Sequence, residues 1–273
     1  MNSLPPGWKK SDQVSENVKL PLAAQLFPVA EMMVTDLRST LKKVKNAGYD
    51  GVEFFGELRF TAQDVRYALD EAGLQIAGWH TPWQYLNPLN IYSTISYNMV
   101  IGNQFLIVPW MPDETLCTRE SCLRFSSELT WISDVLNMHG MVTGYHNHAT
   151  EFRPTDDTGE LPWEIIAENT PSSLVMQNDI GNGMNGGGDM ISLLKKYPGR
   201  GVTVHMKPYS SKGDDTFFDD PDCEINWDDY FRICRSEAGV RWYIVEYLNP
   251  KRFKNPMDGL AASAKWFREW HDH

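Results

Sequence analysis

The sequence has few cysteines, a deficit of positive charge and no long apolar segment. Its four cysteines, among 273 residues, show no CxxC spacing, which argues against a disulfide framework and favours reduced thiols in a cytoplasmic protein. No run approaches the roughly 18 apolar residues that a membrane helix needs. Residues 1–16 are polar and contain no apolar core, so we expect no signal peptide there.

The charge balance is acidic, since 36 Asp and Glu face 25 Lys and Arg and give a formal net charge of −11 at pH 7. An acidic surface disfavours nucleic acid and anionic membranes as partners. The hydrophobic fraction of 42%, with 12% aromatic residues, is ample for a large core. The composition therefore predicts a folded, soluble and cytoplasmic protein without a nucleic-acid or membrane partner, and it leaves a homo-oligomer open.

From residue 20 onward, short apolar segments that predict strands alternate with segments that have the apolar spacing of helices. The predicted strands cover 20–27, 51–55, 74–80, 105–109, 141–148, 173–179, 201–207 and 240–246. The predicted helices cover 36–46, 61–73, 87–102, 117–139, 162–169, 189–197, 226–238 and 256–271. Strands that alternate with helices form a parallel sheet through right-handed crossovers.

No linker or break in composition separates these units. Eight strand–helix units in a chain of this length fit a closed (β/α)8 TIM barrel better than an open doubly wound sheet. We therefore predict one barrel domain over residues 18–273, preceded by a polar N-terminal arm over residues 1–17. The arm is either a partner-contacting segment or a terminal tail.

Each of the last four predicted strands ends in at least one side chain of a kind that binds metal ions. The polar residues at these ends are His146, His148 and Glu151, then Asp179, then His205 and Lys207, and finally Glu246. A structural salt bridge or a satisfied core histidine explains any one of them, but not all four ends together. Because active sites of (β/α)8 barrels lie at the C-terminal strand ends, the pattern indicates a functional site.

Imidazole nitrogens combined with carboxylate oxygens suit Mn²⁺, Zn²⁺, Co²⁺ or Fe²⁺, and suit Mg²⁺ less well. We predict a divalent metal cofactor, with manganese as the first candidate. Three or four protein ligands would leave positions open for substrate oxygens, as a catalytic metal requires.

The first half of the chain carries further polar residues at the matching strand ends. We predict that Glu53, His80 and Trp83 bind substrate, with Gln25 as a weaker candidate. Aromatic rings beside hydroxyl-binding groups are typical of sugar pockets, but packing in the core explains Trp79 and Trp83 at least as well.

Gly181–Gly186 satisfies the GxGxxG pattern of dinucleotide-binding proteins. Such a site also needs an acidic residue at the end of the next strand, which here ends in His205 and Lys207. We therefore expect a flexible loop at the site rather than NAD binding. The acidic loop at 214–220 is most simply a solvated surface, with a lid as the alternative.

Several motifs occur together and in order along the chain: GYDGVE at 48–53, GYHNHATEF at 144–152, NDIG at 178–181, YPGR at 197–200 with VHMK at 204–207, and IVE at 244–246. With these motifs the sequence resembles the sugar phosphate isomerase/epimerase family, within the xylose isomerase-like TIM barrel superfamily, and its YHNH-motif branch. The resemblance covers nearly the whole chain after residue 18. It implies a divalent metal held from the last four strands.

By this resemblance, Asp179, His205 and Glu246 stand at metal-ligand positions. The motif favours Glu151 as the fourth ligand, with the two histidines of strand 141–148, His146 and His148, in substrate-binding or acid–base roles, and the reverse assignment stays open. Lys207 follows the HxK pattern of this branch and, with Glu246 and the two histidines, completes the predicted catalytic set. Proline follows that lysine where the branch usually has aspartate, which leaves the residues after it without a carried-over role.

The resemblance implies proton abstraction next to a carbonyl through a metal-stabilised enediolate, which leads to isomerisation or epimerisation of a sugar, keto-sugar or sugar phosphate. A lyase or dehydratase acting on a keto-sugar, an inosose or a 3-keto-glycoside would share the same first step. Two other hypotheses are a non-catalytic sugar-binding barrel or complex subunit, and a nuclease like the apurinic endonucleases. The few histidines and the acidic charge argue against the nuclease.

Overall fold

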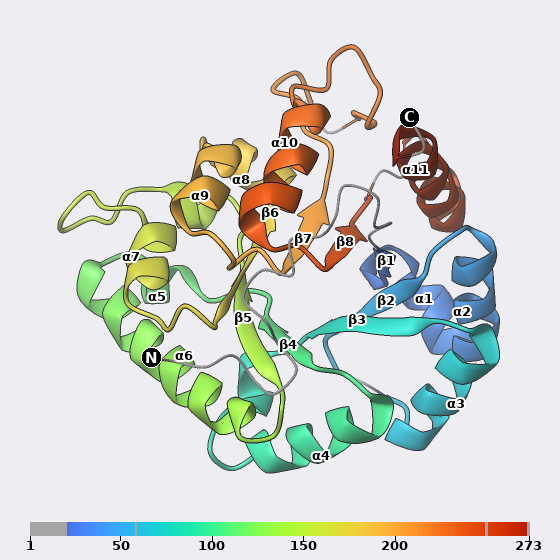
Figure 1. Cartoon of the computed structure of the whole chain (residues 1–273), viewed down its shortest axis with the longest axis horizontal. Helices are drawn as coiled ribbons and strands as arrows, with labels where there is room; N and C mark the ends of the chain where they lie inside the picture. The colour runs from blue at the N-terminus through green and yellow to red at the C-terminus, as the bar shows by residue number, and fades with distance from the viewer. Residues whose placement is uncertain (1–20, 58, 214, 249–250, 272–273) are drawn as a thin grey trace.

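The computed structural model describes residues 21–57, 59–213, 215–248 and 251–271. Eight parallel strands pair in chain order, and the last pairs with the first, so that the sheet closes into a barrel ringed by helices (Figure 1). The predicted TIM barrel is confirmed. The predicted N-terminal arm, residues 1–17, lies outside the described residues.

The strands lie within or at the predicted segments. They are β1 Leu22–Gln25, β2 Gly51–Phe55, β3 Gln75–His80, β4 Phe105–Val108, β5 Val142–His146, β6 Val175–Asp179, β7 Thr203–Met206 and β8 Trp242–Val245. The helices are α1 Ala30–Thr35, α2 Leu37–Asn46, α3 Ala62–Ala72, α4 Ile91–Ile101, α5 Asp113–Leu116, α6 Arg119–Asn137, α7 Pro162–Glu168, α8 Ile180–Asn185, α9 Met190–Lys196, α10 Trp227–Ile233 and α11 Pro256–His271.

Local capping explains where the structure departs from the predicted helices. The predicted helix 117–139 is α6, which begins only after Thr118, because the Thr118 side chain accepts from the Ser121 amide in a capping box. The expected flexible loop at 181–186 is instead largely the short helix α8, which Asp179 caps by accepting from the Asn182 amide. The predicted helix 226–238 is α10 followed by a π-helical turn, Cys234–Ala238.

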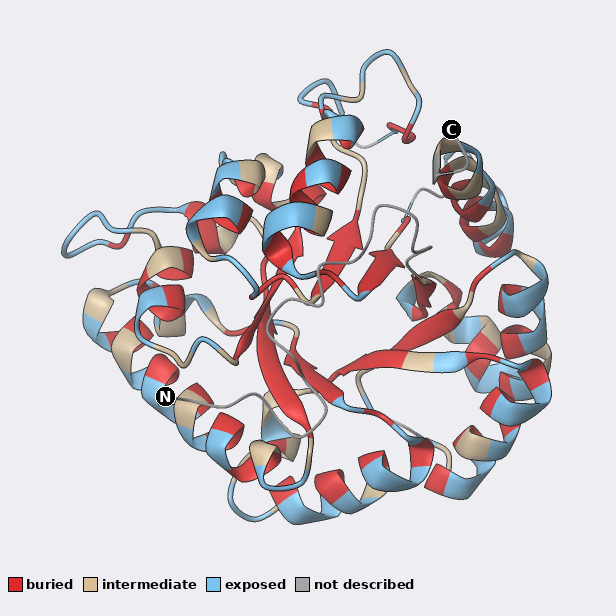
Figure 2. Ribbon diagram, viewed as in Figure 1, coloured by how far each residue is buried: buried red, intermediate tan, exposed pale blue. Residues whose placement is uncertain are grey.

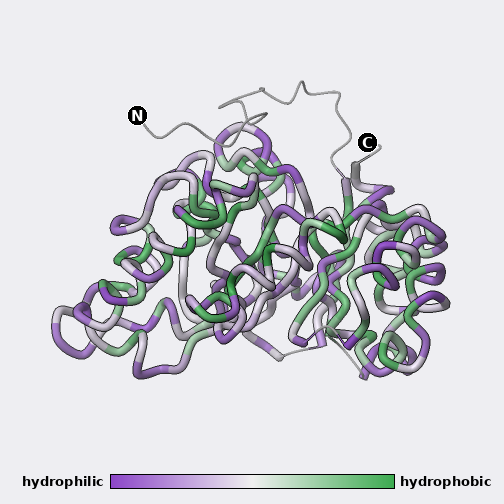
Figure 3. Tube along the Cα trace, turned by 90° about the horizontal axis from the view of Figure 1, so that it is seen from below, coloured by the Kyte–Doolittle hydropathy of each residue, from purple (hydrophilic) through white to green (hydrophobic). Residues whose placement is uncertain are grey.

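Most of the core lies between the barrel and the helices. The helices turn buried faces toward the strands and exposed faces outward (Figure 2), and hydrophobic and hydrophilic stretches alternate along the trace (Figure 3). In α2, for example, Leu37, Leu41 and Val44 share the buried face, as the helical period requires. Among the described residues, no helix combines the length and apolar content needed to cross a bilayer.

A second, smaller core fills the lower interior of the barrel. Its buried side chains alternate along the strands with those that face the helices, and they are Ala23, Ala77, Phe105, Ile107, Val142, Val175, Trp242 and Ile244. Gly51 leaves room for the Trp242 ring, which a β-carbon there would meet at 2.7 Å. The barrel is therefore plugged by apolar side chains at its N-terminal end.

The same alternation places polar side chains in the upper interior. Gln25, Glu53, His80, His146, Gln177 and His205 are all buried there, near the C-terminal ends of their strands. The interior thus changes from apolar to polar along the barrel axis, and the polar end is the one where barrel active sites lie.

Gly144→Ala tests how closely this interior is packed. A β-carbon at position 144 would lie 2.5 Å from the Val175 carbonyl oxygen and 2.7 Å from Ile107 Cδ1. Because the first contact is with backbone, the strands must move apart, and we expect a loss of about 2 kcal/mol or more in the free energy of unfolding, measured by urea denaturation. An unchanged midpoint would show that the strands accommodate the methyl group.

Candidate metal centre

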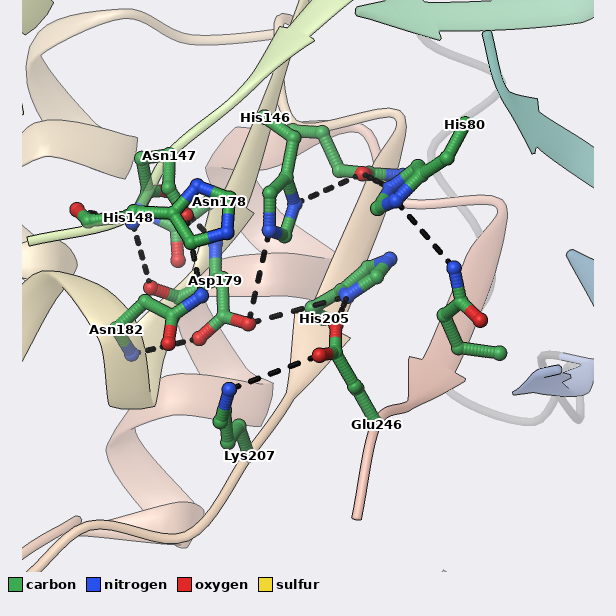
Figure 4. A network of polar contacts seen from close by, with 12 residues as sticks. His80, His146, Asn147, His148, Asn178, Asp179, Asn182, His205, Lys207 and Glu246 are labelled. Carbon is green, nitrogen blue, oxygen red and sulfur yellow. Dashed lines mark hydrogen bonds and ion pairs between the residues drawn. The ribbon is translucent and has the colours of Figure 1, made fainter. Parts of the chain in front are cut away.

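Four side chains from four neighbouring strands converge at the C-terminal end of the barrel. His146, Asp179, His205 and Glu246 each offer one ligand atom, and these atoms all lie within 4.8 Å of one another. Figure 4 shows the four side chains pointing toward a common centre. The first three are buried, and the Glu246 side chain is 13% exposed. The four side chains are therefore shielded from solvent toward the barrel interior, and Glu246 is the one of them that a molecule from solvent can reach.

Asp179 lies at the centre of this group and is held firmly. Its backbone amide donates to Asn147 Oδ1 at 2.8 Å, and Asn147 Nδ2 donates to its carbonyl oxygen at 3.0 Å. Its Oδ1 accepts from the Asn182 amide at 2.7 Å. The other oxygen, Oδ2, is buried with no hydrogen-bond partner among the described residues. It lies 3.8 Å from His205 Nδ1 and 4.0 Å from His146 Nε2.

A buried carboxylate oxygen without a partner is costly unless a cation or a donor satisfies it. Two ligand-type nitrogens, His205 Nδ1 and His146 Nε2, face Asp179 Oδ2 at distances too long for hydrogen bonds. Two imidazoles and two carboxylates form the mixed nitrogen and oxygen set that a first-row divalent metal prefers. The residues present therefore fit a metal ion.

His205 is oriented by Glu53. Its Nε2 lies 2.8 Å from Glu53 Oε2, while Nδ1 faces Glu246 Oε2 at 3.0 Å and Asp179 Oδ2. A carboxylate behind a histidine is the usual way to orient a ligand imidazole. We predicted that Glu53 binds substrate, but its carboxylate is fully buried behind the ring. This place suits an orienting role better.

His80 lies beside the group and not in it. Its ring stacks on that of His205, with centroids 5.0 Å apart. Its Nε2 lies 2.8 Å from Gln177 Oε1, and its Nδ1 lies 3.3 Å from Gln25 Nε2. His80, His146 and His205 form a second set of side chains spaced for a metal. His80 was predicted to bind substrate, but it is buried, like Glu53.

His148 and Lys207 lie nearer the opening. The His148 ring is half-buried and meets His146 edge to face at 5.0 Å, and its Nδ1 has no hydrogen-bond partner among the described residues. Lys207 Nζ lies 3.6 Å from Glu246 Oε1, with 27% of the side chain exposed. With Glu246, these two residues are the predicted catalytic side chains that a bound molecule would meet first.

Glu151, favoured by the motif as the fourth ligand, belongs to neither set of ligand-type side chains. Strand β5 ends at His146, and the chain turns into a short 3-10 helix at Thr150–Phe152. The Glu151 carboxylate accepts from the Tyr145 hydroxyl at 2.5 Å and from the His148 amide at 2.7 Å. Because Tyr145 packs against Phe125 and Trp163, these bonds draw Glu151 toward the helices. In this structure His146, and not Glu151, lies together with Asp179, His205 and Glu246, and which of the two binds a metal stays a prediction.

The two tryptophans at the end of β3 differ in their surroundings. Trp79 is 3% exposed, and its Nε1 donates to the Gly56 carbonyl, as expected of a core residue. Trp83 is half-buried and packs against Phe125, with ring centroids 5.4 Å apart. Only Trp83 of this pair keeps exposed ring surface for a ligand.

The glycines of the segment 181–186 serve close packing. A β-carbon on Gly181 would lie 2.5 Å from the Lys207 carbonyl oxygen, and one on Gly186 would lie 2.5 Å from that of Ala149. Helix α8 is thus wedged between the chain after β5 and the chain after β7. The GxGxxG pattern here reflects this fit.

The charges of the group depend on one another. Burial alone would lower the pKa of His205, but Glu53 and Glu246 raise it to about 10. Burial raises the pKa of Asp179 to about 6, while Lys207 acts against the rise. Burial would also raise the pKa of Glu246, but Lys207 and His205 hold it below its usual range. In the metal-free protein, the positive charge of protonated His205 offsets the negative charges of Glu53 and Glu246.

Residues 41–270 match the xylose isomerase-like TIM barrel family. The chain belongs to this family. The match covers most of the barrel and confirms the resemblance inferred from the sequence motifs. No functionally curated protein matches the chain in sequence.

Solved structures of low sequence identity share the fold. A sugar phosphate isomerase/epimerase from Parabacteroides distasonis ATCC 8503 has a TM-score of 0.77 at 20% identity, covering 91% of this chain and 97% of its own. The IolI protein with a bound zinc atom has a TM-score of 0.68 at 14% identity, covering 92% and 98%. The probable 3-DHS dehydratase AsbF from Bacillus anthracis has a TM-score of 0.67 at 12% identity, covering 91% and 99%.

Asp179→Asn and His205→Ala test the ligand set. Each removes one ligand atom from the centre, so we expect metal content, measured by elemental analysis, to fall from stoichiometric to background. Asp189→Asn is the matched control, because Asp189 also caps a helix by accepting from a backbone amide but lies on the exposed surface at the start of α9. Full metal loading of either site variant, with an intact circular dichroism spectrum, would contradict the assignment.

Metal affinity should rise with pH. His205 carries its extra proton up to a pKa of about 10 in the metal-free protein, and Nδ1 must lose that proton to bind a metal. Between pH 6.5 and 8 we expect about one proton released per ion and about a tenfold gain in affinity per pH unit, with a steeper fall below pH 6 as Asp179 becomes protonated. Titration calorimetry with Zn²⁺ in buffers of different ionisation enthalpy counts the protons. Affinity that is independent of pH would contradict this account.

Proposed function

We propose that this protein is a divalent-metal-dependent enzyme that moves a proton next to the carbonyl of a sugar or keto-sugar and so isomerises or epimerises it. The observation that carries the proposal is the buried Oδ2 of Asp179, which has no hydrogen-bond partner in the described part of the chain and lies at the centre of four converging ligand side chains. The sugar phosphate isomerase/epimerase among the solved structures of similar fold supports the reaction class.

The residues that would hold the metal are His146, Asp179, His205 and Glu246. This choice takes His146 over Glu151, because Glu151 is bonded to Tyr145 and to the His148 amide. When bound, the metal supplies Lewis acidity for the carbonyl and the adjacent hydroxyl of the substrate. The zinc in the IolI structure supports a metal of this kind, and Mn²⁺, Co²⁺ and Fe²⁺ suit the same ligand types.

Two side chains at the opening are suited to carry protons. Lys207 and His205 hold the Glu246 carboxylate ionised, so that it can accept a proton from the substrate carbon. Burial lowers the pKa of His148 to about 4, so that its ring is neutral at pH 7 and can also accept one. The two groups come from different strands, β5 and β8. Two acceptors at different places are what an epimerase needs to remove a proton from one face of a carbon and return it to the other.

A lyase or dehydratase is the second candidate, because proton abstraction next to a carbonyl is its first step too. Lys207 favours it specifically, since an ammonium group 3.6 Å from Glu246 could protonate a departing hydroxyl on the carbon next to the site of abstraction. The dehydratase of similar fold is consistent with such chemistry on this barrel. The two reactions differ in product, and the loss of water or of an alkoxy group distinguishes them.

Exchange of substrate hydrogen for deuterium tests the proposal. We expect the metal-loaded protein to incorporate deuterium from D₂O next to the carbonyl of one member of a panel of ketoses, keto-glycosides and sugar phosphates, followed by mass spectrometry. Glu246→Gln should lower this exchange by about 10²- to 10⁴-fold as a general base is lost. Glu237→Gln is the control, because Glu237 lies in the π-helical turn on the outside of the barrel.

Stoichiometric metal without exchange into any sugar would reject the proposed substrate class while leaving the metal centre standing. Absence of metal after loading with Mn²⁺, Zn²⁺ or Co²⁺ would reject the enzyme and favour a non-catalytic sugar-binding barrel. Product that lacks one water or one alkoxy group would establish the lyase.

A further inference from the structure

The buried amide of Gln177 lies directly beneath the ligand group. Gln177 is 0% exposed and comes two residues before Asp179 on the interior face of β6. Its two polar atoms make four contacts, with side chains of β2, β3, β5 and β7. No other described side chain joins as many strands of the polar layer.

The donors and acceptors among these contacts fix the orientation of the amide. Gln177 Nε2 lies 2.9 Å from Glu53 Oε1 and 2.9 Å from Thr203 Oγ1. A carboxylate oxygen can only accept, so the group facing it must be the amide nitrogen. The carbonyl oxygen Oε1 therefore faces the two histidines, His80 Nε2 at 2.8 Å and His146 Nδ1 at 3.0 Å.

A carbonyl oxygen accepts only, so both ring nitrogens must carry hydrogen. An independent contact supports this for His80, whose other nitrogen, Nδ1, faces Gln25 Nε2 at 3.3 Å. Gln25 Oε1 is already oriented by the Phe27 amide, which donates to it at 2.5 Å, so Gln25 Nε2 is the donor to His80. His80 is thus a neutral ring with hydrogen on Nε2 and an occupied lone pair on Nδ1.

His146 carries its hydrogen on the other ring nitrogen, because it meets Gln177 Oε1 through Nδ1. A neutral ring with hydrogen on Nδ1 has its lone pair on Nε2, and Nε2 is the atom that lies 4.0 Å from Asp179 Oδ2. His146 therefore turns a ligand atom toward the centre, whereas His80 has no lone pair left for a metal. Of the two sets of ligand-type side chains, only the one with Asp179 and Glu246 remains available.

We propose that Gln177 is a positioning residue that fixes the ring hydrogens of His80 and His146, and so makes His146 a metal ligand and excludes His80. The role of the metal rests on the proposed function, but the assignment of the ring hydrogens does not. A single metal with four ligands follows, and a second ion between His80, His146 and His205 is excluded.

Gln177→Met removes the hydrogen-bond acceptor that both rings share, and Gln177→Glu retains one. Methionine has a similar length but accepts no strong hydrogen bond, so His146 is free to move its hydrogen to Nε2, and Zn²⁺ affinity should fall about 10- to 100-fold, the usual effect of losing an orienting partner. Glutamate lies next to the Glu53 carboxylate, so we expect it to be protonated on the oxygen that faces Glu53. Its other oxygen then accepts from both rings, and this variant should bind Zn²⁺ more tightly than the methionine variant. Affinity is measured by competition with a chelator.

Asn178→Leu is the matched control. Asn178 is the next residue of β6 and another buried amide, but it faces the helices, bonding to the Met190 carbonyl at 3.3 Å and the Tyr230 hydroxyl at 3.2 Å. Its loss should lower the melting temperature without changing ring hydrogens or Zn²⁺ affinity. A purely structural role for Gln177 would make the two strand positions behave alike.

Nitrogen-15 NMR of the imidazoles in the metal-free wild type decides the assignment directly, even if a variant fails to fold. We expect hydrogen on Nδ1 of His146 and on Nε2 of His80. Hydrogen on Nε2 of His146, or unchanged ring hydrogens and Zn²⁺ affinity in Gln177→Met, would overturn the inference. A wild type that has the expected ring hydrogens but binds no metal would reject the proposed function and leave the hydrogen assignment standing.

Discussion

The carboxylate of Glu53 is the charge on which the polar half of the barrel interior depends. It is fully buried and has three neighbours, since His205 and His80 approach one oxygen at 2.8 and 3.1 Å and Gln177 donates to the other at 2.9 Å. A buried charge is tolerated only when it is paired and hydrogen-bonded, so the surrounding donors are as much a requirement of Glu53 as a property of the site. Removing Glu53 would leave His205 without its orienting partner and Gln177 without the contact that orients its amide.

The barrel supplies the geometry that this charge requires. Because interior side chains alternate along each strand, Gln177 and Asp179 share the interior face of β6, as Thr203 and His205 share that of β7. Successive layers of the interior are therefore apolar packing, an orienting layer that includes Glu53, Gln177 and His80, and then the ligand side chains. Two of the ligand side chains, His146 and His205, contact the orienting layer through Gln177 and Glu53, and Asp179 is held from the side by the Asn182 amide of helix α8.

The sequence predicted the fold, and it predicted which strand ends bring polar side chains together, because both follow from periodicity. Asp179, His205 and Glu246 come in phase at the ends of apolar strands, and the closed barrel brings such ends together. Periodicity could not place Glu151, because β5 ends at His146 and the following turn carries this carboxylate to the Tyr145 hydroxyl. Gln177 was missed because a glutamine inside a strand is not a ligand type, although its position two residues before an aspartate on the interior face was a usable signal.

The ring hydrogens of the three buried histidines determine which nitrogens can bind a metal, which the residue type alone does not. Three histidines lie within ring-contact distance here, with centroid separations of 4.6 to 5.0 Å, and by type alone each is a metal ligand. Their hydrogen-bond partners differ: His205 faces the Glu53 carboxylate, whereas His80 and His146 share the amide oxygen of Gln177 and meet it through different ring nitrogens. Gln177 Oε1 faces Nε2 of His80 and Nδ1 of His146. In the proposed assignment this one acceptor leaves the Nε2 lone pair of His146 available to a metal, whereas Nε2 of His80 carries hydrogen. If the proposed hydrogens are correct, an ion between His80, His146 and His205 would find no lone pair on His80, and the group of His146, Asp179, His205 and Glu246 would be the better site for a metal.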